Sequence, residues 1–399
     1  MARMTTMQAM RAWTGPAVLS YGFRPFFFLA ALWAILAMGI WIALIFGYAS
    51  FPTLIDPASW HAHEFIFGYA TAVIAGFLLT AVPNWTGRLP IVGWPLLALV
   101  LVWVIGRVVF LIPSKFPYVF AASLDTSFGC LLIFYLAREI VVGRNWRNLP
   151  VLALLLLITL ANSLFHWQVA LQVSSSENIG LRLAIAAEVM LISLIGGRIV
   201  PSFTRNWLVQ QGIKTLPASM ARLDFISLLL SAAALILFVC VPSHGATGFF
   251  SILAGFYHFV RLSRWQSLST LSEPLLWVLH LGYFAIALGF IAVGVSAFGV
   301  LPLAGSLHAW LVGGVGLMSL AVMTRAIRGH TNRPLSASRL TTTLYVLLVV
   351  SLVARYGAVL LPSYSAFGWM SAGGAWFTAF ILFLFEYSPM LFLPRLGQS

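Results

Sequence analysis

The sequence has very few charged residues and very few cysteines. Asp, Glu, Lys and Arg together make up 8% of its 399 residues, whereas ordinary globular proteins carry roughly 25%. This scarcity excludes a soluble enzyme, a nucleic-acid-binding domain and a disordered chain. The two cysteines, Cys130 and Cys240, support neither a disulfide framework nor a cysteine-rich zinc site, and they leave the redox compartment open.

Apolar residues, in contrast, make up 61% of the chain and gather in long runs. A helix needs about 18 or more mainly apolar residues to cross a hydrocarbon core ~30 Å thick, and backbone groups in lipid must be satisfied internally. We therefore predict an all-α polytopic membrane protein with twelve transmembrane helices in a single integral membrane domain, residues 1–399. The predicted spans are 26–47, 60–83, 94–112, 117–142, 149–171, 179–200, 222–242, 246–264, 275–298, 303–324, 341–361 and 367–393.

The net charge of +13, from 22 basic and 9 acidic residues, is a topology signal. Eighteen of the 22 basic residues lie in the two terminal segments, or in and directly beside the loops after spans two, four, six, eight and ten. Only Lys115 and Arg182 lie on the opposite side. Because cytoplasmic loops carry an excess of Lys and Arg, both termini are predicted to be cytoplasmic.

A pattern of polar residues recurs in the second and tenth spans. His63 is followed 23 residues later by Thr-Gly-Arg at 86–88, and His308 is followed 23 residues later by Thr-Asn-Arg at 331–333. Three pseudo-repeats of four helices would account for the pattern, and chance similarity between leucine-rich helices is the alternative. The units would be 1–147, 148–268 and 269–399.

His63 and His308 are candidate haem ligands. Both enter the predicted bundle from the same side at similar depth. Two imidazoles at equal depth on facing helices suit the axial positions of a haem, and imidazole also suits copper. The alternative is that each histidine only bonds a carbonyl group of a neighbouring helix.

Two arginines inside the membrane, Arg107 and Arg355, occupy corresponding places in spans three and eleven. An arginine at such a depth needs an anion. Haem propionates match the guanidinium fork well, and a structural pair with Asp56 or Asp125 is the alternative.

Three further residues, His61, Glu64 and His166, are candidates for copper or a second haem. The pair Asp56-Pro57 predicts a helix start, which places His61 on the same helix as His63. Two positions correspond to roughly 200° around a helix, so these histidines can serve two centres but cannot chelate one metal. Glu64 could orient His61, and His166 could instead be an interfacial residue.

Other ionisable groups are less specific. His258 and His280 lie near the cytoplasmic ends of spans eight and nine and form an alternative pair, while His330 falls in a cytoplasmic loop and is expected to be solvated. Glu188, in span six, is a candidate proton relay. It could also be a neutral acid or a counter-ion.

Three segments carry a resemblance to a known family. YGFRPFF at 21–27, WHAHE at 60–64 and GFLLTAVPNWTGR at 76–88 resemble the NnrS family, polytopic membrane proteins of denitrifying and related bacteria. The resemblance implies twelve helices in the bacterial inner membrane, bound haem and copper, and a role in the response to nitric oxide and nitrosative stress. It does not assign the ligands.

A looser likeness is to the haem-copper oxidases, which have twelve helices in three units of four. In that superfamily a histidine on helix two and another on helix ten hold a low-spin haem, and an HxH pair lies on helix ten. Here the HxH pair, His61 and His63, lies in span two. The copper ligands expected on helices six and seven are missing, which argues against oxidase-type chemistry.

These observations favour a membrane protein that binds haem b and copper and handles nitric oxide. Its expected partners are the lipid bilayer, a small gas such as nitric oxide, and quinol, with no nucleic acid. If it is an enzyme, it is an oxidoreductase acting on nitric oxide or quinol. The alternative is a secondary transporter or proton-coupled carrier without a cofactor, although the repeat is parallel rather than inverted.

Overall fold

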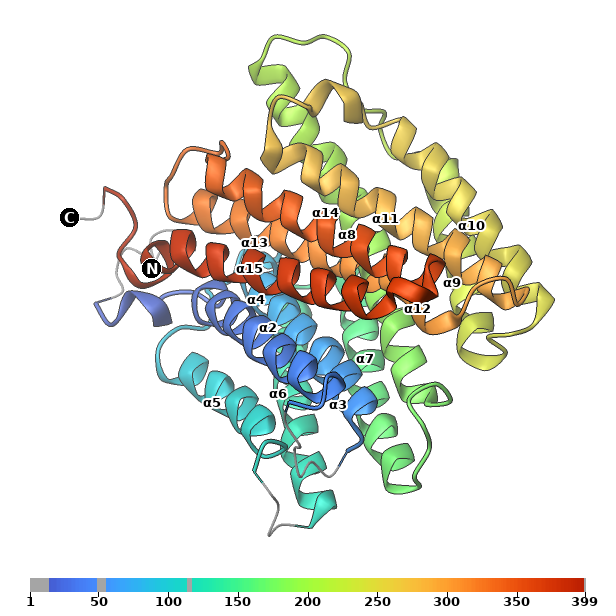
Figure 1. Cartoon of the computed structure of the whole chain (residues 1–399). Coiled ribbons are helices and arrows are strands. Elements are labelled where there is room, and N and C mark those ends of the chain that lie inside the picture. Colours follow the sequence, from blue (N-terminus) through green and yellow to red (C-terminus); the bar gives the residue numbers. More distant parts are fainter. Residues whose placement is uncertain (1–13, 49–54, 113–116, 398–399) are drawn as a thin grey trace. The chain divides into compact units, whose positions relative to one another are not determined.

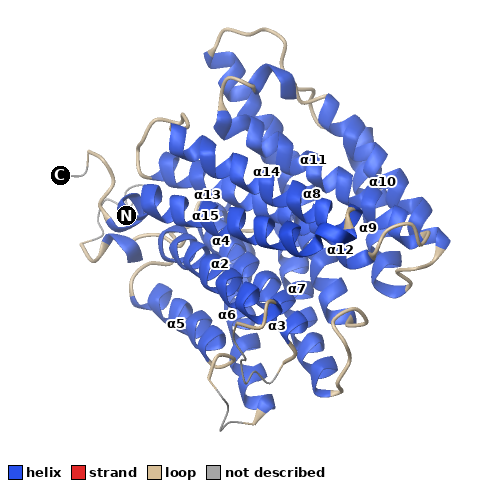
Figure 2. Ribbon diagram, in the orientation of Figure 1, coloured by secondary structure: helices blue, strands red, loops and turns tan. Residues whose placement is uncertain are grey.

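The computed structural model describes residues 14–48, 55–112 and 117–397. Lys115, used above for the orientation, lies outside these residues. Within the described ranges the regular elements are all helices, and no strand occurs (Figure 2). The prediction of an all-α polytopic membrane fold is confirmed.

Each of the twelve predicted spans corresponds to one helix or to a continuous series of helical segments (Figure 1). In chain order these are α2 (Phe23–Ile45), α3 (Pro57–His63) with η2 (Glu64–Ala70) and α4 (Thr71–Thr86), α5 (Trp94–Val108), α6 (Tyr118–Val142), α7 (Leu149–Ala170), α8 (Ile179–Gln210), α9 (Arg222–Cys240), α10 (Gly245–Ser263), α11 (Pro274–Ala297), α12 (Leu303–His308) with η5 (Ala309–Gly316) and α13 (Leu317–His330), α14 (Arg339–Leu360) and α15 (Ser365–Phe392). Short 3₁₀ turns precede α2, α7, α11 and α15. In the part of the chain that the structure describes, ten segments are long and apolar enough to cross a membrane, and α5 is a shorter apolar helix.

The helices form two compact units that alternate along the chain. Unit 1 comprises Met1–Ala184, Arg325–Pro334 and Phe380–Ser399, and unit 2 comprises Ile185–Thr324 and Leu335–Ala379. In unit 1, α2 packs on α4, and α6 packs on both α5 and α7. In unit 2, α11 packs on α10 and on η5, and α14 packs on α12 and η5. The division into three pseudo-repeats stays a prediction.

The second span begins where the sequence predicts. Oδ1 of Asp56 accepts hydrogen bonds from the backbone N–H groups of Ala58 (3.1 Å) and Ser59 (3.0 Å), and Pro57 occupies the first turn. This cap satisfies donors that the first helical turn leaves without an intrahelical partner. It fixes the start of α3 and therefore the positions of the two histidines that follow.

The second and tenth spans share an unusual local structure. His63 is the last residue of α3 and His308 the last residue of α12, and a π-helical segment follows each of them. At the other end of both spans, Gly87 (φ 67°) and Asn332 (φ 61°) adopt the left-handed conformation that closes a helix. Single π turns inside α-helices frequently mark functional sites. The two spans therefore match in backbone conformation as well as in sequence, and both π segments begin beside a candidate ligand.

Candidate metal site

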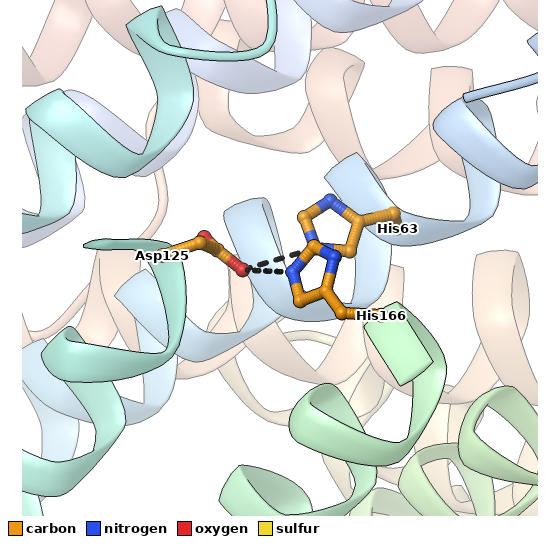
Figure 3. Close-up of side chains that lie close together, drawn as sticks. All are labelled: His63, Asp125 and His166. Atoms are coloured by element: carbon orange, nitrogen blue, oxygen red, sulfur yellow. Dashed lines mark hydrogen bonds and ion pairs between the residues drawn. The ribbon is translucent and has the colours of Figure 1, made fainter. Parts of the chain in front are cut away.

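Three buried side chains from three different helices meet in unit 1. His63 comes from α3, Asp125 from α6 and His166 from α7, and Figure 3 shows the carboxylate of Asp125 directed at both imidazoles. Oδ2 of Asp125 lies 3.1 Å from Nε2 of His63 and 3.0 Å from Nε2 of His166. None of the three residues is more than 4% exposed. A carboxylate and two imidazoles thus converge on one point inside the bundle.

Glu64 and Arg107 hold this group from one side. Oε1 of Glu64 lies 2.9 Å from Nδ1 of His63, and its Oε2 accepts hydrogen bonds from Nη1 of Arg107 (2.8 Å) and Nε1 of Trp33 (2.9 Å). Arg107 also pairs through Nη2 with Oδ1 of Asp125. Arg107 therefore bridges both carboxylates and fixes their positions relative to His63.

A glycine in the π segment makes this bridge possible. A Cβ atom on Gly68 would lie 2.9 Å from both Nη1 of Arg107 and Nε1 of Trp33. Real Cβ atoms are not found so close to other heavy atoms, so a side chain at this position would force those two donors away from Glu64.

Tyr118 and Asn162 complete the surroundings. The hydroxyl oxygen of Tyr118 lies 2.8 Å from Nδ1 of His166 and can accept the N–H of that nitrogen, which leaves Nε2 of the ring unprotonated beside Asp125 and able to bind a cation. Nδ2 of Asn162 donates to Oδ2 of Asp125 (2.7 Å), and its Oδ1 lies 3.2 Å from Nε2 of His63. Such outer partners orient ring nitrogens and carboxylates at metal sites.

His63 is in an unusual hydrogen-bonding position. Nδ1 faces a carboxylate oxygen of Glu64, while Nε2 faces a carboxylate oxygen of Asp125 and the amide oxygen of Asn162. A neutral imidazole has only one N–H to donate. Three arrangements satisfy both nitrogens: a doubly protonated ring, a ring that donates from Nδ1 and accepts at Nε2 from a protonated Asp125, or a ring that donates from Nδ1 and binds a cation through Nε2.

The charges of the cluster allow the same three arrangements. Two carboxylates, Glu64 and Asp125, face one guanidinium, that of Arg107. With both histidines neutral the buried cluster would carry one excess negative charge, which is costly in a membrane interior. A proton on His63 or on Asp125, or a bound cation, would neutralise it.

The donor atoms fit a metal ion. Oδ2 of Asp125 lies 3.0 Å from Nε2 of His166 and 3.1 Å from Nε2 of His63. Metal–nitrogen and metal–oxygen bonds of about 2.0–2.2 Å at right angles place neighbouring ligand atoms about 3 Å apart. The three ligand atoms all lie within 4.8 Å of one another. Two imidazoles and a carboxylate suit copper and iron.

A haem does not fit His63 in the same way. Nε2 is in contact with Asp125 and Asn162, and the ring stacks on Phe165 with centroids 4.8 Å apart. An axial bond to haem iron would require both polar partners to leave. The guanidinium of Arg107 already pairs with Glu64 and Asp125. The pair with Asp125 is the structural alternative to binding a haem propionate.

His308 and Arg355, both in unit 2, have a more open arrangement. Nδ1 of His308 donates to the carbonyl oxygen of Ala304 (2.6 Å), and its Nε2 makes no hydrogen bond to any described residue. Arg355, on the adjacent α14, is half-buried and pairs with no described carboxylate. An N–H donated to a backbone carbonyl is the usual orientation of a metal-bound histidine. His63 and His308 lie in different units, and their pairing as axial ligands stays a prediction.

The remaining candidates lie elsewhere. His61 stacks on Trp41 with centroids 4.3 Å apart, on the other face of α3 from His63. It is Glu64 that contacts His63, rather than orienting His61 as expected. His330 is not a solvated loop residue, because it ends α13 and stacks on Phe23.

The alternative pair and the proposed proton relay lie in unit 2. Both ring nitrogens of His258 contact hydroxyl groups, of Ser231 (2.7 Å) and Tyr283 (2.8 Å), and those of His280 contact Thr204 and Ser267. No hydrogen bond or ring contact joins the two histidines within the described ranges. Glu188 is 2% exposed, and neither of its carboxylate oxygens has a hydrogen-bond partner among the described residues.

Sequence reasoning did not identify Asp125 and Asn162 as parts of a metal site. An acidic residue inside an otherwise apolar span is a signal in itself, because such groups face the bundle interior and find partners there. Asn162 carries no such signal. The role of Asn162 depends on which helices lie next to α6 and α7.

One family model, described as NnrS protein, matches residues 17–395. No curated protein matches the chain.

Proposed function

This chain belongs to the NnrS family, and we propose that it is a copper-binding membrane protein of the nitric oxide response, with the metal held by His63, Asp125 and His166. The observation that carries the proposal is the position of His63, whose two ring nitrogens both face acceptor atoms. A cation on Nε2 lets Nδ1 donate to Glu64 without a conflict, in the carboxylate–histidine–metal arrangement common at metal sites.

The charge count favours copper in its monovalent state. Glu64, Asp125 and Arg107 together carry one excess negative charge when the histidines are neutral, so a single positive charge makes the buried group neutral. Imidazole ligands are compatible with copper, and iron is the other metal that this ligand set suits. Bound copper would supply a coordination position at which a small gas such as nitric oxide can bind.

The protein residues have separate tasks in this proposal. Arg107 holds both carboxylates in place, Glu64 fixes the ring of His63, and Tyr118 fixes the ring of His166. The surrounding Phe110 and Phe165 rings exclude water from the group. A water-poor site favours an uncharged gas over ionic competitors.

We propose that haem b binds at a second site, in unit 2. His308 keeps Nε2 available as an axial ligand, and Arg355 lies close enough to interact electrostatically with it and could bind a propionate. A bound haem would supply an iron centre. We further propose that quinol donates electrons and that Glu188 relays protons. The protein lies, in this proposal, in the bacterial inner membrane with both termini in the cytoplasm.

The proposal is tested by metal analysis of protein purified after growth with ample copper and haem. Wild-type protein should contain copper, and His166→Ala and Asp125→Asn should lose most of it. His61→Ala is the matched control, because this histidine lies on the same short helix and contacts a different set of side chains. Wild type without copper or iron, or equal metal content in all four proteins, would overturn the metal site.

An optical spectrum of the same samples tests the haem. A Soret band that is present in wild type and absent in His308→Ala supports this part, and a wild-type spectrum without a Soret band refutes it. A cofactor-free transporter would show neither metal nor haem. Survival of a deletion strain under a nitric oxide donor, complemented with each variant, connects the metal site to the cellular role.

A further inference from the structure

A second polar cluster lies in unit 1, at the ends of three helices away from the metal site. Arg24 lies at the start of α2, His330 ends α13, Arg333 follows it, and Arg395 follows the end of α15. The side chain of Arg24 interacts electrostatically with Arg333, and His330 interacts with both Arg24 and Arg395. We call these four residues the basic cluster.

Arg24 is fixed in place by backbone carbonyl groups. Its Nη1 donates to the carbonyl oxygens of Leu391 (2.9 Å) and Leu393 (2.8 Å) at the end of α15, and the guanidinium lies over the ring of Phe23. The side chain is 1% exposed, yet its Nε has no hydrogen-bond partner among the described residues. Carbonyl dipoles offset part of the charge, and one donor remains unused.

Arg333 and Arg395 are positioned by the segment that follows α13. Nη2 of Arg395 donates to Oδ1 of Asn332 (3.4 Å), and Nδ2 of Asn332 donates to the carbonyl oxygen of Leu396 (3.2 Å). Asn332 has a left-handed backbone (φ 61°), and the backbone N–H of Leu396 donates to the carbonyl oxygen of Thr331 (3.3 Å), so the segments that follow α13 and α15 are in contact. Nη1 of Arg333 is buried and has no partner in the part of the chain that the structure describes.

Among the residues that the structure describes, no acidic side chain pairs with the arginines of the basic cluster. Arg24, Arg333 and Arg395 form no ion pair with a described carboxylate, while Arg328 pairs with Glu386 at 3.6 Å. Burial and then the positive charge of the neighbouring Arg328 lower the pKa of Arg333. Three guanidinium groups with two unused buried donors point to an anion that is not part of the chain.

We propose that Arg24, Arg333 and Arg395 bind the phosphate group of an anionic phospholipid. Guanidinium forks match phosphate oxygens in geometry and charge. The cluster lies at the ends of membrane-crossing helices, which is the depth of lipid headgroups. Phe392, Leu393 and Leu396 are 46–54% exposed beside it and offer apolar surface for acyl chains. Free phosphate has the same oxygens but would leave this apolar surface unused.

The test measures lipid binding to delipidated full-length protein in a neutral detergent. The protein is titrated separately with phosphatidylglycerol, phosphatidylcholine and inorganic phosphate. Two readouts are recorded for each titration: the thermal unfolding midpoint and the lipid-bound species seen by native mass spectrometry. Phosphatidylglycerol should bind wild type and raise the midpoint. Arg333→Gln and Arg395→Gln should each weaken binding about tenfold, the effect of losing one charge-assisted hydrogen bond.

Arg147→Gln is the matched control, since Arg147 is an exposed arginine of the same unit, and it should bind like wild type. Arg24 is left unchanged because it also caps α15. Equal stabilisation by phosphatidylglycerol and inorganic phosphate would overturn the lipid as ligand and leave phosphate itself. Equal binding of phosphatidylcholine, or unchanged binding in both cluster variants, would overturn the site. Copper content should be unchanged in these variants, so the two proposals fail independently.

Discussion

Nε2 of His63 lies 3.1 Å from Oδ2 of Asp125, although the two residues are 62 positions apart and lie on different helices. The same carboxylate oxygen contacts His166 and Asn162. One oxygen atom therefore joins α3, α6 and α7 within unit 1. Variants around this atom test the metal site and the packing of the unit separately.

Tyr118→Phe should weaken metal binding without removing a ligand. The hydroxyl that contacts Nδ1 of His166 is lost, so the ring can rotate and Nε2 is no longer held toward Asp125. Loss of such an outer partner typically lowers metal affinity about 10–100-fold. Competition with a copper chelator measures the change. Tyr135→Phe on the same helix is the control, and an identical affinity in both variants would contradict the assigned role.

Arg107→Gln should destabilise the protein strongly. It leaves Glu64 and Asp125 as two buried carboxylates without a cation, and breaking a buried ion pair costs about 3–5 kcal/mol. Thermal unfolding in detergent measures the loss, with the exposed Arg138→Gln as control. Adding Asp125→Asn should restore part of the stability. Additive losses in the double variant would show that the two side chains are not coupled.

Gly68→Ala should reduce both stability and metal content. The new methyl group would meet Arg107 and Trp33 at 2.9 Å, and overpacking of this kind costs about 1–3 kcal/mol. Gly374→Ala is the matched change, because nothing lies within 4 Å of its Cβ position. That control should be neutral or gain up to about 1 kcal/mol from helix propensity. A Gly68 variant that behaves like the control would refute the close approach.

Copper should stabilise the protein less as the pH falls. A histidine nitrogen binds metal only without its proton, so protons compete for Nε2 of His63 and His166. At a copper concentration 100 times the dissociation constant the stabilisation is about 2.7 kcal/mol, and it should shrink in acid. The unfolding midpoint with and without copper between neutral and acidic pH provides the measurement. A copper-induced shift that persists in His166→Ala would place the metal elsewhere.

The sequence predicts the helices well because each span is a long apolar run. The second span, for example, is predicted at 60–83 and begins at Pro57, where Asp56 caps it. The π segment that follows His63 is not predictable in this way. Its residues are as apolar as those of an α-helix, and only the hydrogen-bond register differs.

The site is predictable in part. His63, Glu64, Arg107 and His166 are identifiable as polar groups in the membrane, and the structure brings all four together. Their partners are not identifiable, because hydropathy does not say which helices are neighbours. The expected contact between Glu64 and His61 is wrong for a local reason. The carboxylate of Glu64 points to the buried guanidinium of Arg107 and forms an ion pair with it.

The π segment after His63 also makes the length of this span critical. Each added residue turns a helix by about 100°, and a π turn accommodates one residue more than the α-helix around it. Deleting a single residue between Phe65 and Ala70 would therefore restore a regular helix and keep His63 and α4 in register. The same deletion within α4 has no extra turn to absorb it, so it would rotate His63 by about 100° relative to the helix that follows and move the ligand away from Asp125 without any change in its chemistry.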